Sequence, residues 1–168
     1  MTHAYDEAFV LTRALPYHGY CFVCGDENPH GIGLTWKASF RRKSPDEAGR
    51  FPPGSVLVSS DFHFKPAQQG PPGHAHGGAS AAVIAEAMGA SVWQSGYRAL
   101  LAHYELDYRQ PVPLNAPVRV EAWVEKVDGR KVYARGRLLL ANGEVAVSGS
   151  GLYLHIPGFF EDNRFQHS

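Results

Sequence analysis

The chain has 168 residues, of which 44% are hydrophobic, and its 16 basic and 16 acidic side chains give a formal net charge of zero. This length suits one domain with its own core, and the balanced charge excludes a large basic surface for nucleic acid or for an anionic membrane. No apolar run approaches a membrane span, and the N-terminus lacks the organisation of a signal peptide. We therefore expect a cytoplasmic protein.

The first part of the chain combines a predicted helix with a cysteine motif. Residues 4–15 are predicted to form a short helix that ends at Pro16. Cys21 and Cys24 form a single C-x-x-C, whereas a structural zinc site needs four ligands. Histidines further along the chain are candidates to complete a mixed site, namely His63, His74 and His76. A tight Cys-Gly turn explains the motif more simply, so we expect neither a bound metal ion nor a cofactor.

Two strands are predicted before the middle of the chain. Ile32, Leu34 and Trp36 alternate with small or polar residues and predict a strand over residues 32–40. A second alternating run predicts a strand over residues 56–64. Residues 65–73 are rich in proline and glycine, which is typical of a connection.

The connection leads into His76-Gly77-Gly78-Ala79, which opens an alanine-rich run and predicts a helix over residues 77–94. The run carries almost nothing larger than valine or isoleucine, so neighbouring elements can approach this helix from every side, as they do in a buried helix. Glycines at a helix start let a ligand approach the backbone and leave N–H groups free to contact it. The same pattern also fits a plain loop followed by a tightly packed helix.

Only strands are predicted after this helix. Alternating runs cover residues 100–109, 118–125 and 131–141, and a last strand ends near Leu154. Asp128-Gly129 and Asn142-Gly143 lie between such runs and favour type I′ hairpin turns, which predicts an antiparallel meander.

These elements predict an α+β hotdog fold, in which a curved antiparallel sheet of about six strands wraps around one long central helix. We expect a single domain over residues 1–168, with an N-terminal helix and loop (1–30), a core (31–155) and a C-terminal tail (156–168). One helix leaves sheet edges unpaired, so a homodimer or tetramer is also expected.

Four motifs in this order resemble the PaaI-like hotdog thioesterases, which hydrolyse acyl-CoA. The motifs are Cys-Phe-Val-Cys-Gly-x-x-Asn-Pro-x-Gly (21–31), Gln-Gly-Pro-Pro-Gly-x-x-His-Gly-Gly (69–78), Glu-Ala-Met-Gly (86–89) and Tyr-Arg-Gln-Pro-Val-Pro-Leu (108–114). The resemblance covers residues 21–154, nearly the whole chain. It implies an acyl-CoA thioester as substrate, bound at a dimer interface.

The resemblance also implies roles for individual residues. His76 would bind or polarise the thioester, the backbone N–H of Gly77 would hold the oxyanion, and Gly78 would contact the substrate. The family's acidic residue, nine positions after the histidine, falls on Ala85, and the carboxylate stands one position later as Glu86. One helical step turns a side chain by roughly 100°, so Glu86 is a candidate either for the base or for a structural role. The family's hydroxyl residue on the following strand falls on Leu101.

Other acid–base or substrate-binding candidates are Asp61 and His63 on the second strand and His74 in the glycine-rich loop. Two further functions stay open. A dehydratase or hydratase acting on acyl thioesters is the second enzymatic alternative. An acyl-CoA or aromatic-ligand binding protein without hydrolysis is favoured by the apolar Ala85 and Leu101.

Overall fold

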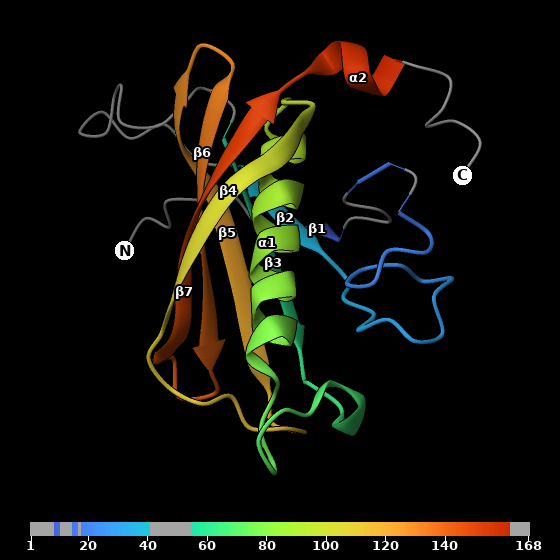
Figure 1. Ribbon diagram of the computed structural model, residues 1–168, viewed down its shortest axis with the longest axis vertical. Coiled ribbons are helices and arrows are strands. Elements are labelled where there is room, and N and C mark those ends of the chain that lie inside the picture. Colours follow the sequence, from blue (N-terminus) through green and yellow to red (C-terminus); the bar gives the residue numbers. More distant parts are fainter. Residues whose placement is uncertain (1–8, 11–14, 17, 41–54, 162–168) are drawn as a thin grey trace.

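A computed structural model describes residues 9–10, 15–16, 18–40 and 55–161 (Figure 1). In chain order the strands and helices are β1 (Phe9–Val10), β2 (Lys37–Phe40), β3 (Val56–Phe62), α1 (Gly77–Gln94), β4 (Ala99–Tyr108), β5 (Val118–Asp128), β6 (Lys131–Leu140), β7 (Val145–His155) and α2 (Pro157–Glu161), with one 3₁₀ turn at Pro66–Gln68. The predicted helix over residues 77–94 is confirmed at both ends.

The strands form one seven-stranded antiparallel sheet in the order β1-β2-β3-β5-β6-β7-β4. Figure 1 shows this sheet curving around α1, which is the predicted hotdog arrangement. Gly129 and Gly143 both have positive φ, of 57° and 83°, at the two predicted hairpin turns. All six predicted strands are present, and β1 adds a short seventh.

Small residues on both elements bring α1 close to the sheet. A Cβ on Gly136 would lie 3.0 Å from Ile84 Cγ2 and 3.1 Å from Met88 Cγ. Gly149, its register partner on β7, is equally restricted, since a Cβ there would lie 3.2 Å from Ile84 Cγ2. Ser91 joins the helix to β3 by donating a 2.7 Å hydrogen bond to the Val56 carbonyl. The alanine-rich sequence therefore produces a tightly enclosed helix.

Two predictions for the first part of the chain need correction. Phe9 and Val10 form an edge strand paired with Ala38 and Lys37, so a helix over residues 4–15 is wrong at these positions; residues 4–8 and 11–14 of that prediction lie outside the described part. An aromatic and a β-branched residue suit such an edge strand. The strand expected from residue 32 begins only at Lys37, because the backbone N–H groups of residues 32–34 bond to Phe22 and Val23 carbonyls in the N-terminal loop instead.

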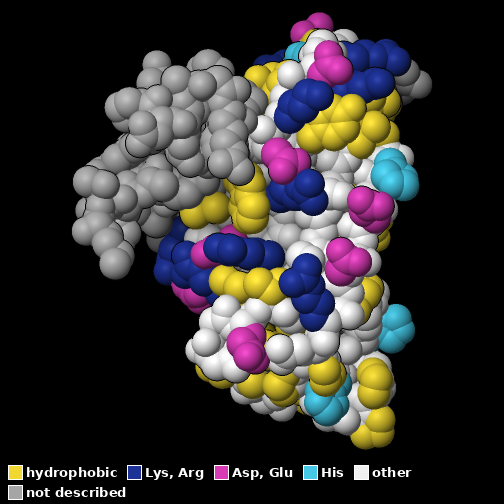
Figure 2. All heavy atoms as spheres, turned by 90° about the vertical axis from the view of Figure 1, so that its left-hand side faces the viewer, with side chains coloured by type: hydrophobic (Ala, Val, Ile, Leu, Met, Phe, Trp, Pro, Cys, Tyr) yellow, Lys and Arg dark blue, Asp and Glu magenta, His cyan; other side chains and the backbone are white. Residues whose placement is uncertain are grey.

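The outer face of the sheet carries neighbouring charges of opposite sign (Figure 2). Arg119 contacts Asp61 at 3.0 Å and Glu121 at 2.9 Å, and Arg137 contacts Glu121 at 2.8 Å. The pairs Arg119–Asp61 and Arg137–Glu121 join neighbouring strands, and such cross-strand pairs stabilise the exposed face of a sheet. Basic side chains on this face are therefore interspersed with acidic ones, as the balanced composition predicts.

The last described element packs back onto the end of α1. Phe160 of α2 lies edge-on against Trp93, with ring centroids 4.8 Å apart. Part of the predicted tail thus covers the helix. Among the described residues, no helix combines the length and apolar character needed to cross a membrane.

Candidate active site

The start of α1 is held in place by its own first residues. His76 is the N-cap, with an extended backbone at φ −64° and ψ 136°, and its Nδ1 accepts a 2.9 Å hydrogen bond from Gly78 N–H. Tyr108, at the end of β4, donates a 2.8 Å hydrogen bond to the Gly77 carbonyl. Within the described residues no acceptor is recorded for the Gly77 N–H. A free donor at a helix N-terminus is suited to bind an anion or an oxyanion.

A small cavity of about 350 Å³ adjoins this helix start. Its lining residues are Phe22, His30, Ala67, Gln68, Gln69, His76, Gly78 and Ala79. The loop before the helix is fixed there by the His76 N–H, which donates to the Gln68 carbonyl at 2.8 Å. Gly70 lets this loop approach, because a Cβ at that position would lie 2.7 Å from His76 Cα.

A larger cavity of about 940 Å³ lies between the flank of α1, the N-terminal loop, the start of β4 and α2. Ala85, Glu86 and Leu101 all line it. The two positions where the resemblance expects polar groups, Ala85 and Leu101, therefore face the same space and make that wall apolar. Tyr153 also lines it and donates a 2.7 Å hydrogen bond to the Ala85 carbonyl.

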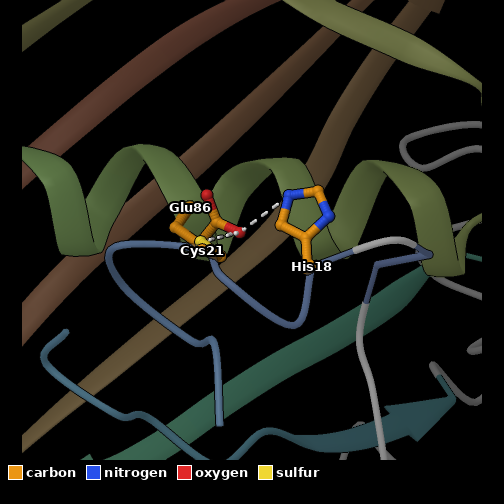
Figure 3. Close-up of side chains that lie close together, drawn as sticks. All are labelled: His18, Cys21 and Glu86. Carbon is orange, nitrogen blue, oxygen red and sulfur yellow. Dashed lines mark hydrogen bonds and ion pairs between the residues drawn. The ribbon is translucent and has the colours of Figure 1, made fainter. Parts of the chain in front are cut away.

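Glu86 lies in this cavity against three side chains of the N-terminal loop. His18 and Cys21 point toward it from that loop (Figure 3). Glu86 Oε1 is 3.5 Å from His18 Nε2 and 3.4 Å from Cys21 Sγ, and it accepts a 3.4 Å hydrogen bond from the Cys24 thiol. Burial, together with the charge of Cys21, raises the pKa of Glu86 to about 7, although the charge of His18 opposes this.

The two cysteines have opposite proton affinities. Hydrogen bonding with the Cys24 side chain and with backbone N–H groups lowers the pKa of Cys21 to about 5, although burial opposes this. The same hydrogen bond and burial raise the pKa of Cys24. Both cysteines are free of disulfides, and the lowered pKa makes Cys21 the more readily deprotonated of the two.

The structure brings some of the predicted site residues together and separates others. His76, Gly77 and Gly78 meet at the start of α1, whereas Glu86 lies about 14 Å further along the helix, at about 1.5 Å per residue. Asp61 is on the outer face of the sheet, where it pairs with Arg119 and Lys37. His63 is exposed just beyond β3, and His74 Nδ1 lies 3.0 Å from the Pro72 carbonyl. None of these last three lines either cavity.

His18 was not recognised as a site residue from the sequence. It stands three residues before Cys21, so the loop reads H-x-x-C-x-x-C. That spacing was a usable signal, because a histidine beside a C-x-x-C is a common start of a ligand set. The contact with Glu86 carried no local signal, since the two residues are far apart in the chain.

Comparisons with known proteins show similarity to thioesterases. Residues 72–147 match the model of the thioesterase superfamily. The acyl-coenzyme A thioesterase THEM4 of Xenopus laevis is 38% identical over 103 residues, which are 61% of this chain and 41% of that protein. This chain therefore spans less than half the length of the curated relative that it matches.

Solved structures agree on the fold. A crystal structure of a thioesterase superfamily protein superposes with a TM-score of 0.65 at 29% identity and covers 79% of this chain and 61% of that one. The PaaI protein of Escherichia coli superposes with a TM-score of 0.56 at 12% identity, over 60% of this chain and 72% of PaaI. The hotdog fold and the resemblance to PaaI-like thioesterases are thus confirmed.

Proposed function

We propose that this chain, which contains a thioesterase superfamily domain, hydrolyses an acyl-CoA thioester. The observation that carries the proposal is the start of α1, where the Gly77 N–H is free and the His76 imidazole is exposed beside a cavity. The relative named as an acyl-coenzyme A thioesterase supports this choice of substrate class.

The chemistry follows from these groups. Water adds to the thioester carbonyl, the carbon–sulfur bond breaks, and the products are a carboxylic acid and the CoA thiol. Negative charge develops on the carbonyl oxygen, and the Gly77 N–H at the positive end of α1 stabilises it. One such donor contributes about 10²–10³ to kcat. His76 orients the thioester beside it, and Gly78 keeps the approach open.

The identity of the base is the open part of this proposal. Glu86 stays the carboxylate predicted from the sequence, and a pKa of about 7 suits a proton acceptor near neutral pH. Its contacts with His18, Cys21 and Cys24 support a structural role instead. The apolar wall at Ala85 and Leu101 supports the second candidate function, an acyl-CoA binding protein that turns over slowly or not at all.

We also propose that two copies of the chain form a homodimer. In the described part of the chain β4 pairs only with β7 and leaves its other edge open. This strand exposes large side chains, with Leu100 at 41%, Tyr104 at 38% and Tyr108 at 54% of full exposure. An open edge with apolar side chains is suited to pairing with a second copy. Because Tyr108 bonds Gly77, that copy would lie beside the start of α1. The cytoplasmic location and the alternative of a tetramer stay predictions.

Substitution of Gly77 tests the oxyanion donor directly. Proline is tolerated at the first position of a helix and has no N–H, and the extended backbone of His76 suits a residue that precedes proline. Gly77→Ala is the matched control that keeps the N–H, since its Cβ would lie at an ordinary 3.5 Å from Tyr108 Cε1.

The measurement is thiol release from a panel of acyl-CoA substrates. We expect kcat of Gly77→Pro to fall about 10²–10³-fold below that of Gly77→Ala, with the same melting temperature for both. Equal rates would reject the oxyanion role. Thermal stabilisation by acyl-CoA without thiol release from the unaltered protein would select the binding function.

A further inference from the structure

The cluster around Glu86 collects side chains of a kind that bind metal ions. The ligand atoms of His18, Cys21 and Glu86 all lie within 4.8 Å of one another, and Cys24 Sγ lies 3.4 Å from Glu86 Oε1. We propose that His18, Cys21, Cys24 and Glu86 bind a zinc ion that fastens the N-terminal loop to α1. This site goes beyond the proposed function and does not depend on it.

The chemistry of the four side chains favours zinc. They offer one imidazole nitrogen, two sulfurs and one carboxylate oxygen, and Zn²⁺ accepts all three kinds of atom in a tetrahedral arrangement. Bonds of about 2.0–2.3 Å separate the ligand atoms of a tetrahedron by about 3.3–3.8 Å. The distances from Glu86 Oε1 to His18 Nε2 and to the two sulfurs are 3.5, 3.4 and 3.4 Å. Cys24 Sγ is not among the ligand atoms that all lie within 4.8 Å of one another, so its side chain must move to complete the tetrahedron.

Hydrogen bonds already hold the His18 and Cys21 side chains in orientations suited to binding a metal ion. His18 Nδ1 lies 2.8 Å from the Pro16 carbonyl. A hydrogen bond from Nδ1–H to that carbonyl leaves the Nε2 lone pair directed at Glu86, as in metal-bound histidines. Val23 N–H donates to Cys21 Sγ at 3.4 Å, which stabilises a sulfur ligand. These contacts orient the donor atoms independently of any ion.

The loop backbone is also built for close packing at the cysteines. A Cβ on Gly25 would collide with the Gly19 carbonyl and with the backbone of Cys21, so only glycine fits after Cys24. Gly25 N–H donates to the Cys21 carbonyl at 2.9 Å and closes the turn that places both sulfurs on the same side. The C-x-x-C turn therefore presents its sulfurs to the helix.

The charges at the site also favour a cation. In the described part of the chain, no Lys or Arg is recorded within ion-pair distance of Glu86, and its only basic neighbour is His18. Glu86 is largely buried, with 18% of its side chain exposed. Buried carboxylates that lack a strong partner commonly coordinate metals. With four protein ligands the site is closed, so the ion has a structural role and Glu86 is not available as a base.

The first experiment measures bound zinc by mass spectrometry of the full chain, purified without metal-affinity steps and under reductant. We expect about one zinc ion per chain, and loss of at least nine-tenths of it in the double variant Cys21→Ser/Cys24→Ser and in Glu86→Gln. His30→Gln is the matched control, because His30 lies in the same loop, exposed and outside the cluster. It should keep its zinc.

The second experiment replaces zinc with cobalt in the unaltered chain and does not depend on the folding of any variant. Tetrahedral cobalt bound to sulfur gives thiolate-to-metal charge-transfer absorption, and a chelator should remove both this band and part of the thermal stability. Absence of the band overturns the proposal. Zinc that remains in the double variant also overturns it, because that zinc would be bound by adventitious surface histidines. A Cys21–Cys24 disulfide in protein kept under reductant would overturn it as well.

Discussion

Ala85 is the residue at which this chain departs most clearly from the thioesterases that it resembles. It lines the larger cavity together with Glu86 and Leu101. An aspartate there would face the same space. The carboxylate of Glu86 is instead engaged with His18 and the two cysteines.

We expect Ala85→Asp to increase the rate of acyl-CoA hydrolysis. Acid–base assistance contributes about 10²–10⁴-fold, so even partial restoration is measurable as kcat for thiol release. Ala82→Asp is the matched control, since Ala82 lines the same cavity one turn earlier on α1. An equal gain from both variants, or no gain from Ala85→Asp with folding intact, would show that position 85 is not the missing base.

His76 combines two roles that substitution can separate. Its Nδ1 caps α1 through Gly78 N–H, so His76→Ala should lower the free energy of unfolding by about 1 kcal/mol. Asparagine is a good N-cap, and His76→Asn should restore that stability. If the imidazole also contacts the thioester, both variants lose activity. Denaturant unfolding and kcat/KM provide the two readouts, and full activity in His76→Asn would leave His76 with the capping role alone.

At the scale of elements, the approach of α1 to the sheet depends on glycines of β6 and β7. A Cβ on Gly149 would lie 3.2 Å from Ile84 Cγ2 of α1. It would also collide with the Leu106 side chain of β4 and lie 3.3 Å from the Glu105 carbonyl oxygen, a backbone atom that cannot turn away. Overpacking costs about 1–3 kcal/mol, and replacing a strand glycine returns about 0.5–1 kcal/mol. We therefore expect Gly149→Ala to destabilise the fold by about 1–2 kcal/mol, measured by denaturant unfolding.

Gly158→Ala is the control for this substitution, because nothing lies within 4 Å of a Cβ at that position. It should leave the unfolding midpoint nearly unchanged. Equal effects of the two substitutions would show that Gly149 is not needed for the close contact between helix and sheet.

Elements with a local cause were predictable from the sequence. The small-residue run bounded by His76 and Gln94 specifies α1, and Asp128-Gly129 and Asn142-Gly143 specify the meander because their glycines adopt positive φ. β1 was not predictable in this way. Phe9 and Val10 form a strand only because β2 offers them an edge, and the pattern around them suggested a helix.

The residues of the candidate site also differ in whether a local sequence pattern predicts them. His76 and Gly77 belong to the helix start and follow from the motif itself, whereas the cluster of His18, the cysteines and Glu86 depends on how the loop folds back on α1. A tertiary contact between residues 68 positions apart has no periodicity to reveal it. Only the H-x-x-C-x-x-C spacing pointed in that direction.

At the scale of the whole molecule, the exposed edge of β4 determines how copies would assemble. Its side chains from Leu100 to Glu105 are exposed on both faces of the strand. This is unusual for a strand hydrogen-bonded to a long neighbour such as β7, and it indicates a surface that is covered in the assembled protein.

We expect Tyr104→Asp to convert the proposed dimer into a monomer. Tyr104 lies near the middle of β4 and is 38% exposed, so two-fold pairing along this edge would bring two new carboxylates into one desolvated contact, where like charges repel. Sedimentation velocity should give one mass near that of two chains for the unaltered protein and near 18.4 kDa for the variant. Tyr20→Asp is the matched control, because Tyr20 is 73% exposed but belongs to the N-terminal loop. A dimer that survives Tyr104→Asp, or a monomeric unaltered protein at micromolar concentration, would show that β4 is not the interface.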